Sequence, residues 1–538
     1  MAADGGSMNA ASARQACVVC KTRKKKCNKL LPSCGYCIRK GLQCVYMPVP
    51  QTHSSEPVKH RHAASGWGSR PSLEIVSCRR SLAAVLSQRS TEAETGHQIY
   101  LEVYGLIRET EQFVEDISTR FFQGFHRHLP IVSRTRFYNN LITLGSTPTA
   151  DFSILLLAIC LITYSPAAGC QPSQSNASQT SSKQALYLSA KSLFAQIQVS
   201  CSPSVSLIQA GILLAMYEYI NGRPDDAFIT LASVTRLAYC ARIHICNGQE
   251  TQILSESGQT PDSDLLLLHE EAVNTWWGIV ICERIFLCEA GVIEQPTITV
   301  FPDANARLPI EPQVLDHLES RGPEPLPNIP VSCITSPSVG AFGRTVQAAC
   351  LLDQVLKATL PSTDIDSRLL QLDRLDANLQ SFLTLMLPKS QEQPGLYCTV
   401  VHIAMRALFT LHGHILDQKP QVVRANFQSL EQWQQRSREA LDTVTKMALD
   451  ILQFLSAAHL ESAATPRIDA MPPMYPYVAC AALDHLHHTS QNKDVAWLAG
   501  AVDLLRRFFA RYYQHWTVGE RRVKDQAAAG EKGDGSAA

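Results

Sequence analysis

The chain has 538 residues, and its 48 basic and 48 acidic side chains give a formal net charge of zero at pH 7. A hydrophobic content of 45% and a charged content of 18% are typical of a globular protein with a large core, and the length allows two or more domains. The most apolar run, residues 152–164, is shorter than the ~20 residues of a bilayer span, and residues 1–15 lack the apolar core of a signal peptide, so we expect neither a membrane protein nor a secreted one.

Six cysteines lie close together near the N-terminus. The first three and the last three share the spacing C-x2-C-x6-C. Two thiolates three positions apart can bind one zinc ion, which prefers four ligands in a tetrahedron. Six thiolates complete two such sites if two sulfurs are shared, so the spacing predicts a two-zinc cluster with bridging thiolates. The predicted ligands are Cys17, Cys20, Cys27, Cys34, Cys37 and Cys44.

A run of cations follows the second cysteine. Five of the six residues 21–26 are basic, and no acidic residue occurs within residues 5–55. A cluster of six thiolates and two zinc ions is itself negative, but five cations exceed what that charge needs and leave a surface suited to phosphate. On a short helix Lys21, Lys24 and Lys25 share one face. One lysine can donate to guanine in the major groove while its neighbours hold phosphates.

These features together resemble the fungal six-cysteine binuclear zinc cluster, the DNA-binding module of a large transcription-factor family. The resemblance rests on the six cysteines, the basic run and Pro32 in the connecting loop. It implies one shared pair of thiolates and one further pair for each metal: Cys17 and Cys34 as the bridging pair, then Cys20 with Cys27, and Cys37 with Cys44.

The same resemblance implies roles for the basic residues. Lys24 falls on the lysine that reads a CGG-type triplet in this family, and Arg23 lies beside it, so double-stranded DNA is the implied partner. The other lysines of the run are expected to neutralise phosphates: Lys21, Lys25 and Lys26. Relatives often carry an acid where this chain has Asn28, and we expect that difference to have little effect.

The rest of the chain predicts a mainly α-helical protein, in which a flexible linker joins the small zinc module to a large all-α regulatory domain. In chain order we expect a disordered N-terminus over 1–14, the zinc cluster over 15–46, the linker over 47–96, the all-α body over 97–516 and a disordered tail over 517–538. The mildly basic linker is either a solvated tether or a segment that follows the DNA backbone. No heptad pattern persists between residues 73 and 107, so homodimerisation is left open.

Apolar residues recur near a 3.6-residue period through the body, and no alternating strand pattern occurs. Helices are expected over 99–129, 137–144, 154–164, 185–199, 205–219, 224–244, 270–290, 345–357, 367–385, 400–415, 430–455, 477–488 and 494–515. Residues 165–183, rich in Ser, Gln and Asn, predict a loop, and the proline-rich residues 292–335 predict a long surface connection.

Residues 112–310 resemble the fungal-specific transcription factor domain, also called the middle homology region. Short motifs in a fixed order carry the resemblance: Phe122-x-x-Phe125-His126 with Leu129-Pro130-Ile131, Gln209 to Leu214 leading to Gly222-Arg223, Arg236-Leu237-Ala238 with His244, and Trp276-Trp277 before Glu283-Arg284. The resemblance implies a regulatory role through masking, dimerisation, effector binding or coregulator recruitment. We expect the tryptophan pair in the core, with a ligand pocket as the alternative.

Twelve cysteines lie outside the cluster without a recurring spacing. Many occur in apolar runs, such as those around Cys160, Cys240 and Cys282. We interpret them as buried, reduced thiols, which indicates a reducing compartment.

We therefore predict a sequence-specific DNA-binding transcription factor of the RNA polymerase II type, located in the nucleus, where the basic run doubles as an import signal. The resemblance implies partners in the transcription machinery and control of pathway genes, including a secondary-metabolite biosynthetic cluster. The alternative is a regulator whose zinc module binds protein instead of DNA. An enzyme is not expected, because no phosphate-binding glycine loop, Gly-x-Ser-x-Gly elbow or zinc-protease motif occurs.

Overall fold

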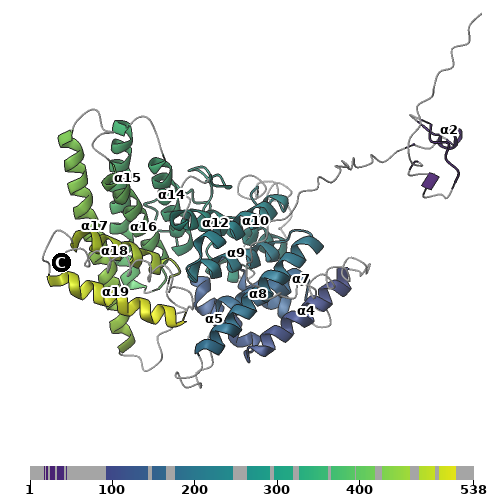
Figure 1. Cartoon of the computed structure of the whole chain (residues 1–538), viewed down its shortest axis with the longest axis horizontal. Helices are drawn as coiled ribbons and strands as arrows, with labels where there is room; N and C mark the ends of the chain where they lie inside the picture. The colour runs from purple at the N-terminus through teal and green to yellow at the C-terminus, as the bar shows by residue number, and fades with distance from the viewer. Residues whose placement is uncertain are drawn as a thin grey trace, which may run out of the picture. The chain divides into compact units, whose positions relative to one another are not determined.

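The computed structural model describes residues 17, 20–21, 25–30, 33–40, 44, 92–142, 148–164, 176–245, 263–290, 296–318, 326–360, 365–393, 395–418, 427–460, 472–490 and 496–515. The chain divides into two compact units, residues 1–83 and 84–538. Throughout these described ranges the second unit is helical and contains no β-strand (Figure 1), as the sequence predicts. The expected disordered ends and most of the expected linker lie outside the described residues.

The described part of the second unit begins with α4, which starts at Glu92, within the segment expected to be linker. Its first half comprises α4 (Glu92–Glu109), α5 (Val114–Gln123), the 3-10 helix η1 (Phe125–Arg127), α6 (Arg134–Ile142), α7 (Ala150–Ile162), α8 (Asn176–Ser200), α9 (Val205–Ile220), α10 (Pro224–Cys240) and α12 (Ser263–Glu289). The second half comprises α13 (Pro312–Asp316), α14 (Ala341–Thr359), α15 (Ile365–Glu392), α16 (Cys398–Leu416), α17 (Phe427–Leu460), α18 (Tyr475–Ser490) and α19 (Ala496–His515). None of the helices in these described parts combines the length and the apolar character needed to cross a membrane.

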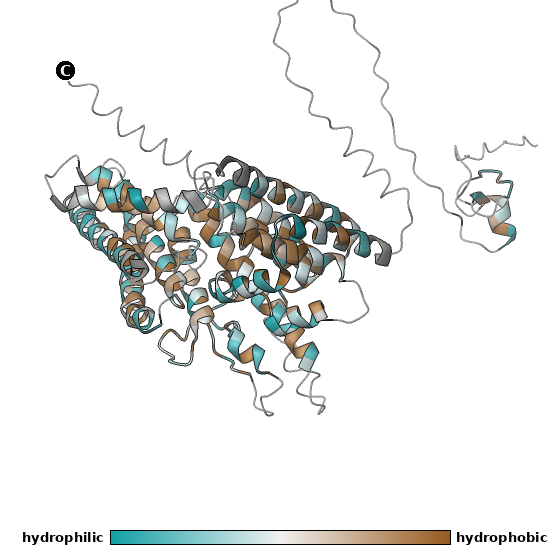
Figure 2. Ribbon diagram, turned by 90° about the horizontal axis from the view of Figure 1, so that it is seen from below, coloured by the Kyte–Doolittle hydropathy of each residue, from teal (hydrophilic) through white to brown (hydrophobic). Residues whose placement is uncertain are grey.

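Helix α9 is the centre of the first half. Every side chain from Leu207 to Ile220 is buried, because α7, α8, α10 and α12 pack around it. A helix that is apolar on all sides is the pattern of a fully buried segment, and Figure 2 shows hydrophobic ribbon concentrated inside the bundle. Side chains of α8 and α10 approach the backbone of α9 closely at Gly211, where an added Cβ would lie 2.3 Å from Val234 Cγ2 and 2.9 Å from Phe194 Cζ. Glycine at this position therefore allows α8, α9 and α10 to pack together.

A buried polar network ties α9 and α12 to the segment after η1. The Gln209 side-chain amide donates to the Ile131 carbonyl at 2.7 Å and to Glu271 Oε1 at 3.0 Å. The Glu271 carboxylate also accepts a hydrogen bond from the Ser133 backbone N–H at 2.8 Å and forms an ion pair with Arg136. Burial without such partners would be costly for each of these groups, so the network specifies how these elements pack.

A second buried network is centred on Arg284 of α12. Its Nε donates to Asp353 Oδ1 of α14 at 2.9 Å, and its terminal nitrogens donate to Glu283 at 2.7 Å and to the Thr299 carbonyl at 2.9 Å. The Arg284 side chain is 1% exposed and lies over the Phe301 ring. The Glu283-Arg284 motif therefore links α12, the following connection and α14.

The tryptophan pair lies in the core, as expected. Trp276 is 4% exposed and packs edge-on against Tyr239 with 5.3 Å between ring centroids. Trp277 is fully buried, and its indole N–H donates to the Arg307 carbonyl at 3.2 Å.

Several expected boundaries were wrong. Helix α8 begins at Asn176, inside the segment 165–183 expected to be a loop, and Lys183 is buried with its ammonium 5.9 Å from the Tyr217 ring centroid. Once packed turns exist, each added residue gains a backbone hydrogen bond, so polar residues extend the helix. Helix α12 likewise begins at Ser263 rather than 270.

Two further expectations need correction in the later part of the unit. Helix α15 continues to Glu392 with Pro388 inside it, although the periodicity predicts an end at 385. Within the expected connection 292–335, residues 312–316 form the short helix α13.

Burial of the cysteines outside the cluster is only partly as expected. Cys160 and Cys282 are buried, but Cys240 is exposed because it is the last residue of α10. The apolar run around Cys240 did not indicate which face the thiol would occupy. All the cysteines in the described ranges are free thiols.

Candidate metal centre

The six cysteines of the first unit converge. The Cys17, Cys20, Cys34 and Cys37 thiols are fully buried, and those of Cys27 and Cys44 are partly buried. Cys34 is the N-cap of the short helix α2 (Gly35–Arg39), which also carries Cys37. Burial of thiols in so small a unit, which has no other described core, points to a centre that the sulfurs themselves build.

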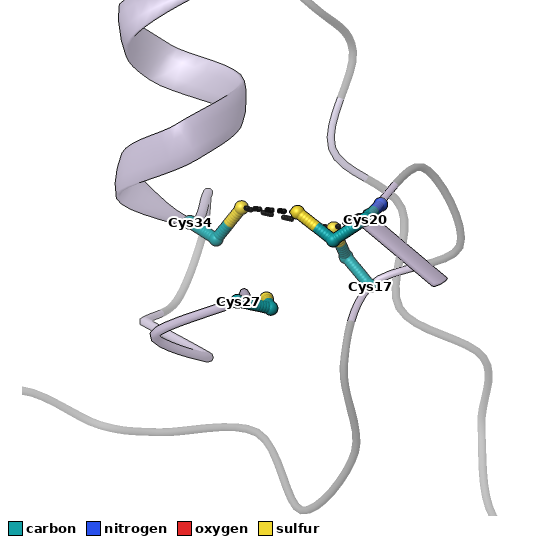
Figure 3. A group of neighbouring side chains, drawn as sticks. All are labelled: Cys17, Cys20, Cys27 and Cys34. Carbon is teal, nitrogen blue, oxygen red and sulfur yellow. Dashed lines mark hydrogen bonds between the residues drawn. The ribbon is translucent and has the colours of Figure 1, made fainter. Parts of the chain in front are cut away.

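The sulfurs form two groups of four. Within each group all sulfur atoms lie within 4.8 Å of one another, and the two groups share two members. One group is Cys17, Cys20, Cys27 and Cys34, and the other is Cys17, Cys34, Cys37 and Cys44. Figure 3 shows the first group, with the Cys34 sulfur directed toward those of Cys17 and Cys20. Two tetrahedra with a common edge therefore suit this arrangement.

The sulfur separations fit tetrahedral zinc. The distances are 3.7 Å for Cys17–Cys34 and Cys17–Cys37 and 3.6 Å for Cys20–Cys34. A tetrahedron with zinc–sulfur bonds of ~2.3 Å has an edge of ~3.8 Å. Disulfide sulfurs lie only ~2.05 Å apart, so these thiols are spaced for a metal and not bonded to one another.

The sequence repeat produces a structural repeat. In the first half the Lys21 N–H donates to the Cys17 carbonyl at 3.0 Å, and in the second half the Ile38 N–H donates to the Cys34 carbonyl at 3.1 Å. The Cys20 N–H lies 3.5 Å from the Cys17 sulfur, and the Cys37 N–H lies 3.4 Å from the Cys34 sulfur. Each shared sulfur is thus held by the same helical turn in its own half.

The local electrostatics distinguish the thiols. The Cys37 backbone N–H, donating to the Cys34 sulfur, lowers the pKa of Cys34 to about 6. Burial raises the pKa of Cys37 to about 12 and raises the pKa values of Cys17 and Cys20. A bound cation would reverse these latter shifts, because metal binding displaces the thiol protons.

Asn28 has a structural role that the sequence did not reveal. Its Oδ1 accepts the Gly35 N–H at 2.8 Å, which satisfies one free donor in the first turn of α2. An acid at this position would offer the same acceptor oxygen. This is a physical reason to expect that the difference from the relatives has little effect.

We expect Asn28→Ala to loosen the module, since losing an acceptor at a helix N-terminus costs ~0.5–2 kcal/mol. Zinc transfer from the full chain to a chromogenic chelator should become faster than in the wild type. Asn28→Asp retains the acceptor and serves as the matched control. An alanine variant that releases zinc at the wild-type rate would contradict this role.

The structure describes only part of the predicted DNA-contacting set. Lys21, Lys25 and Lys26 are exposed to solvent. The two residues expected to read bases, Arg23 and Lys24, lie outside the described residues. Exposed Arg39 and Lys40 at the end of α2 add to the positive charge of the module.

Two family models match the chain. The model described as the fungal Zn(2)-Cys(6) binuclear cluster domain matches residues 15–53, and the model described as the fungal specific transcription factor domain matches residues 119–335. Transcription factor BOA15 of Botryotinia fuckeliana (strain B05.10) is 25% identical over 131 residues, which cover 24% of this chain and 68% of that relative.

Proposed function

Because the chain belongs to the fungal Zn2Cys6 transcription factors and is not an enzyme, we propose that its cysteine cluster holds two zinc ions and presents the basic run to double-stranded DNA. The observation that carries the proposal is the sharing of Cys17 and Cys34 between the two groups of four sulfurs. Six thiolates can surround two metals completely only with such sharing.

The residues have distinct roles in this proposal. Cys20 and Cys27 complete the first site, and Cys37 and Cys44 complete the second, with Cys17 and Cys34 bridging. Zinc would supply structural cross-links alone, because protein thiolates fill every position and leave none open for chemistry. The cross-links would tie both halves of the module together, which its small core needs.

The basic residues then divide into base readers and phosphate binders. Lys24 and Arg23 would contact a CGG-type triplet in the major groove, where lysine and arginine pair with guanine O6 and N7. Lys21, Lys25 and Lys26 would neutralise phosphates, and their exposure supports this role. No acidic residue occurs within 5–55, so only the negative charge of the cluster itself would offset these cations.

A salt titration of the purified full chain tests DNA binding against protein binding by the module. We expect log K for a CGG-containing duplex to fall linearly with log salt, with a slope set by several released counterions. A flat salt dependence, or no duplex binding, would favour the alternative in which the module contacts protein.

For Lys24→Ala we expect specific binding to weaken by ~1–3 kcal/mol, because one guanine contact is lost while the cysteine cluster is untouched. Fluorescence anisotropy with a CGG duplex and a scrambled duplex measures the loss. The control, Lys25→Ala, should weaken both duplexes alike and reduce the salt slope by about one. A Lys24→Ala titration identical to that of the wild type would refute base reading by this residue.

The proposal extends to the cellular role. In this role the protein would act in the nucleus on genes transcribed by RNA polymerase II, and its helical unit would recruit coregulators. Its targets would be pathway genes, such as a secondary-metabolite cluster. Family membership supports each of these, and a homodimer binding two triplets is compatible with them. A genome-wide map of bound DNA tests target genes and half-site spacing together, and random occupancy without enriched CGG triplets would contradict sequence-specific regulation.

A further inference from the structure

A groove lies in the second half of the helical unit. Helices α15 and α17 both pack against α16 (Figure 1). The space between them is a groove of about 310 Å³. Small-molecule pockets in proteins span ~300–1,000 Å³, and this groove lies outside the segment 119–335 that matches the regulatory-domain family model.

The floor of the groove is partly apolar. Leu372 of α15 and Leu411 and Ile415 of α16 are buried beneath it, and the half-buried Trp433 ring of α17 forms one side. Flat apolar groups gain most from such a surface, because they displace water from aliphatic and aromatic carbon together.

One buried polar side chain on the floor lacks a complete set of partners. His412 is 3% exposed, and its Nδ1 lies 3.2 Å from Ser437 Oγ. Its Nε2 makes no hydrogen bond within the described part of the chain; it lies 3.3 Å from Asp376 Oδ1 but is not aligned with it. A buried ring nitrogen without a hydrogen bond is unfavourable, and a polar group of a bound molecule can satisfy it.

The rim carries an excess of negative charge. Three carboxylates, Asp373, Asp376 and Glu439, face a single guanidinium, that of Arg436. Burial alone would raise the pKa of Asp376, but the neighbouring His412 ring and the Gln380 amide hold it below its usual value. Neither Asp373 nor Glu439 forms an ion pair with any described residue. The Gln435 amide donates to Glu439 Oε1 at 2.8 Å and the Gln380 amide donates to Asp376 Oδ1 at 2.9 Å. Each of these two carboxylates keeps a second oxygen that can accept from a bound cation.

We propose that this groove binds a small organic amine with a flat apolar body. The ammonium would lie between the carboxylates of Asp373 and Asp376, the body would lie against Trp433 and Leu411, and a polar group near the floor would meet His412. Such a ligand would bridge α15 and α17 and stabilise their packing, so the melting temperature should rise with the logarithm of ligand concentration above the dissociation constant. This site is independent of the DNA interface, since neither proposal requires the other.

The test compares two probes of the same shape and opposite charge. Isothermal titration of the full chain with tryptamine should show saturable binding, whereas indole-3-propionate, which has the same ring and a carboxylate, should bind at least about 10-fold more weakly. Equal affinity for the two probes, or no saturable tryptamine binding up to millimolar concentration, would overturn the proposal.

Variants locate the binding. Asp373→Asn, at an exposed position, and the double variant D373N/D376N should each weaken tryptamine binding, the double variant by about 10-fold or more. Asp450→Asn removes an exposed carboxylate of α17 outside the groove and should bind tryptamine like the wild type. Wild-type affinity in Asp373→Asn and the double variant would refute the site, and duplex binding measured on the same samples reports separately on the proposed DNA interface.

Discussion

Cys17→Ser should lose both zinc ions, whereas Cys27→Ser should retain one. Cys17 belongs to both groups of four sulfurs, but Cys27 belongs to only one. A structural zinc site contributes an apparent ~10–16 kcal/mol at neutral pH, far more than a small module can replace by packing. The loss should therefore unfold the module and abolish binding to a CGG duplex. Metal content of the purified full chain, measured by mass spectrometry, gives the stoichiometry.

The matched control is Cys240→Ser, which removes an exposed thiol at the end of α10. It should leave metal content and DNA binding unchanged. If Cys17→Ser kept two zinc ions, bridging by that sulfur would be wrong. If Cys17→Ser and Cys27→Ser lost equal amounts of metal, the division into shared and unshared thiolates would fail.

Arg284→Ala should destabilise the helical unit by about 3–5 kcal/mol, the cost of breaking a buried ion pair by removing one partner. The substitution leaves the buried carboxylates of Glu283 and Asp353 without their guanidinium, and it removes the donor to the Thr299 carbonyl. Thermal and denaturant unfolding of the full chain should show a lower midpoint for the helical unit, while zinc content stays at the wild-type level.

An exposed pair supplies the comparison. Arg507 and Asp503 form an ion pair on α19 in which both side chains are more than half exposed. Exposed pairs contribute ~0–1 kcal/mol, so Arg507→Ala should hardly move the midpoint. Equal shifts for the two arginine variants would show that the buried network around Arg284 does not hold α12 and α14 together.

The helices of the body were predictable in type more than in number or extent: the helical segment expected over 99–129 is divided into α4, α5 and η1. Apolar periodicity located α9 and α14 to within a few residues, because both are buried along most of their length. It failed at the start of α8, where polar residues continue a helix that is stabilised by the packing of its later turns. It also failed at Cys240, since periodicity alone does not identify which face of a helix end meets solvent.

The sequence by itself determined which residues make up the candidate metal centre, because the six cysteines lie between positions 17 and 44 and their spacing limits which sulfurs can meet. The family resemblance of the sequence already implied that Cys17 and Cys34 are the shared pair, and these two cysteines belong to both groups of four sulfurs. Only the tertiary structure decided which partners surround Arg284 and that α15 and α17 leave a charged groove above α16. The physical reason is the sequence separation of the residues that meet. The cysteines of the repeat are close in the chain, so their spacing limits their geometry, whereas contacts between distant helices depend on how whole helix faces pack.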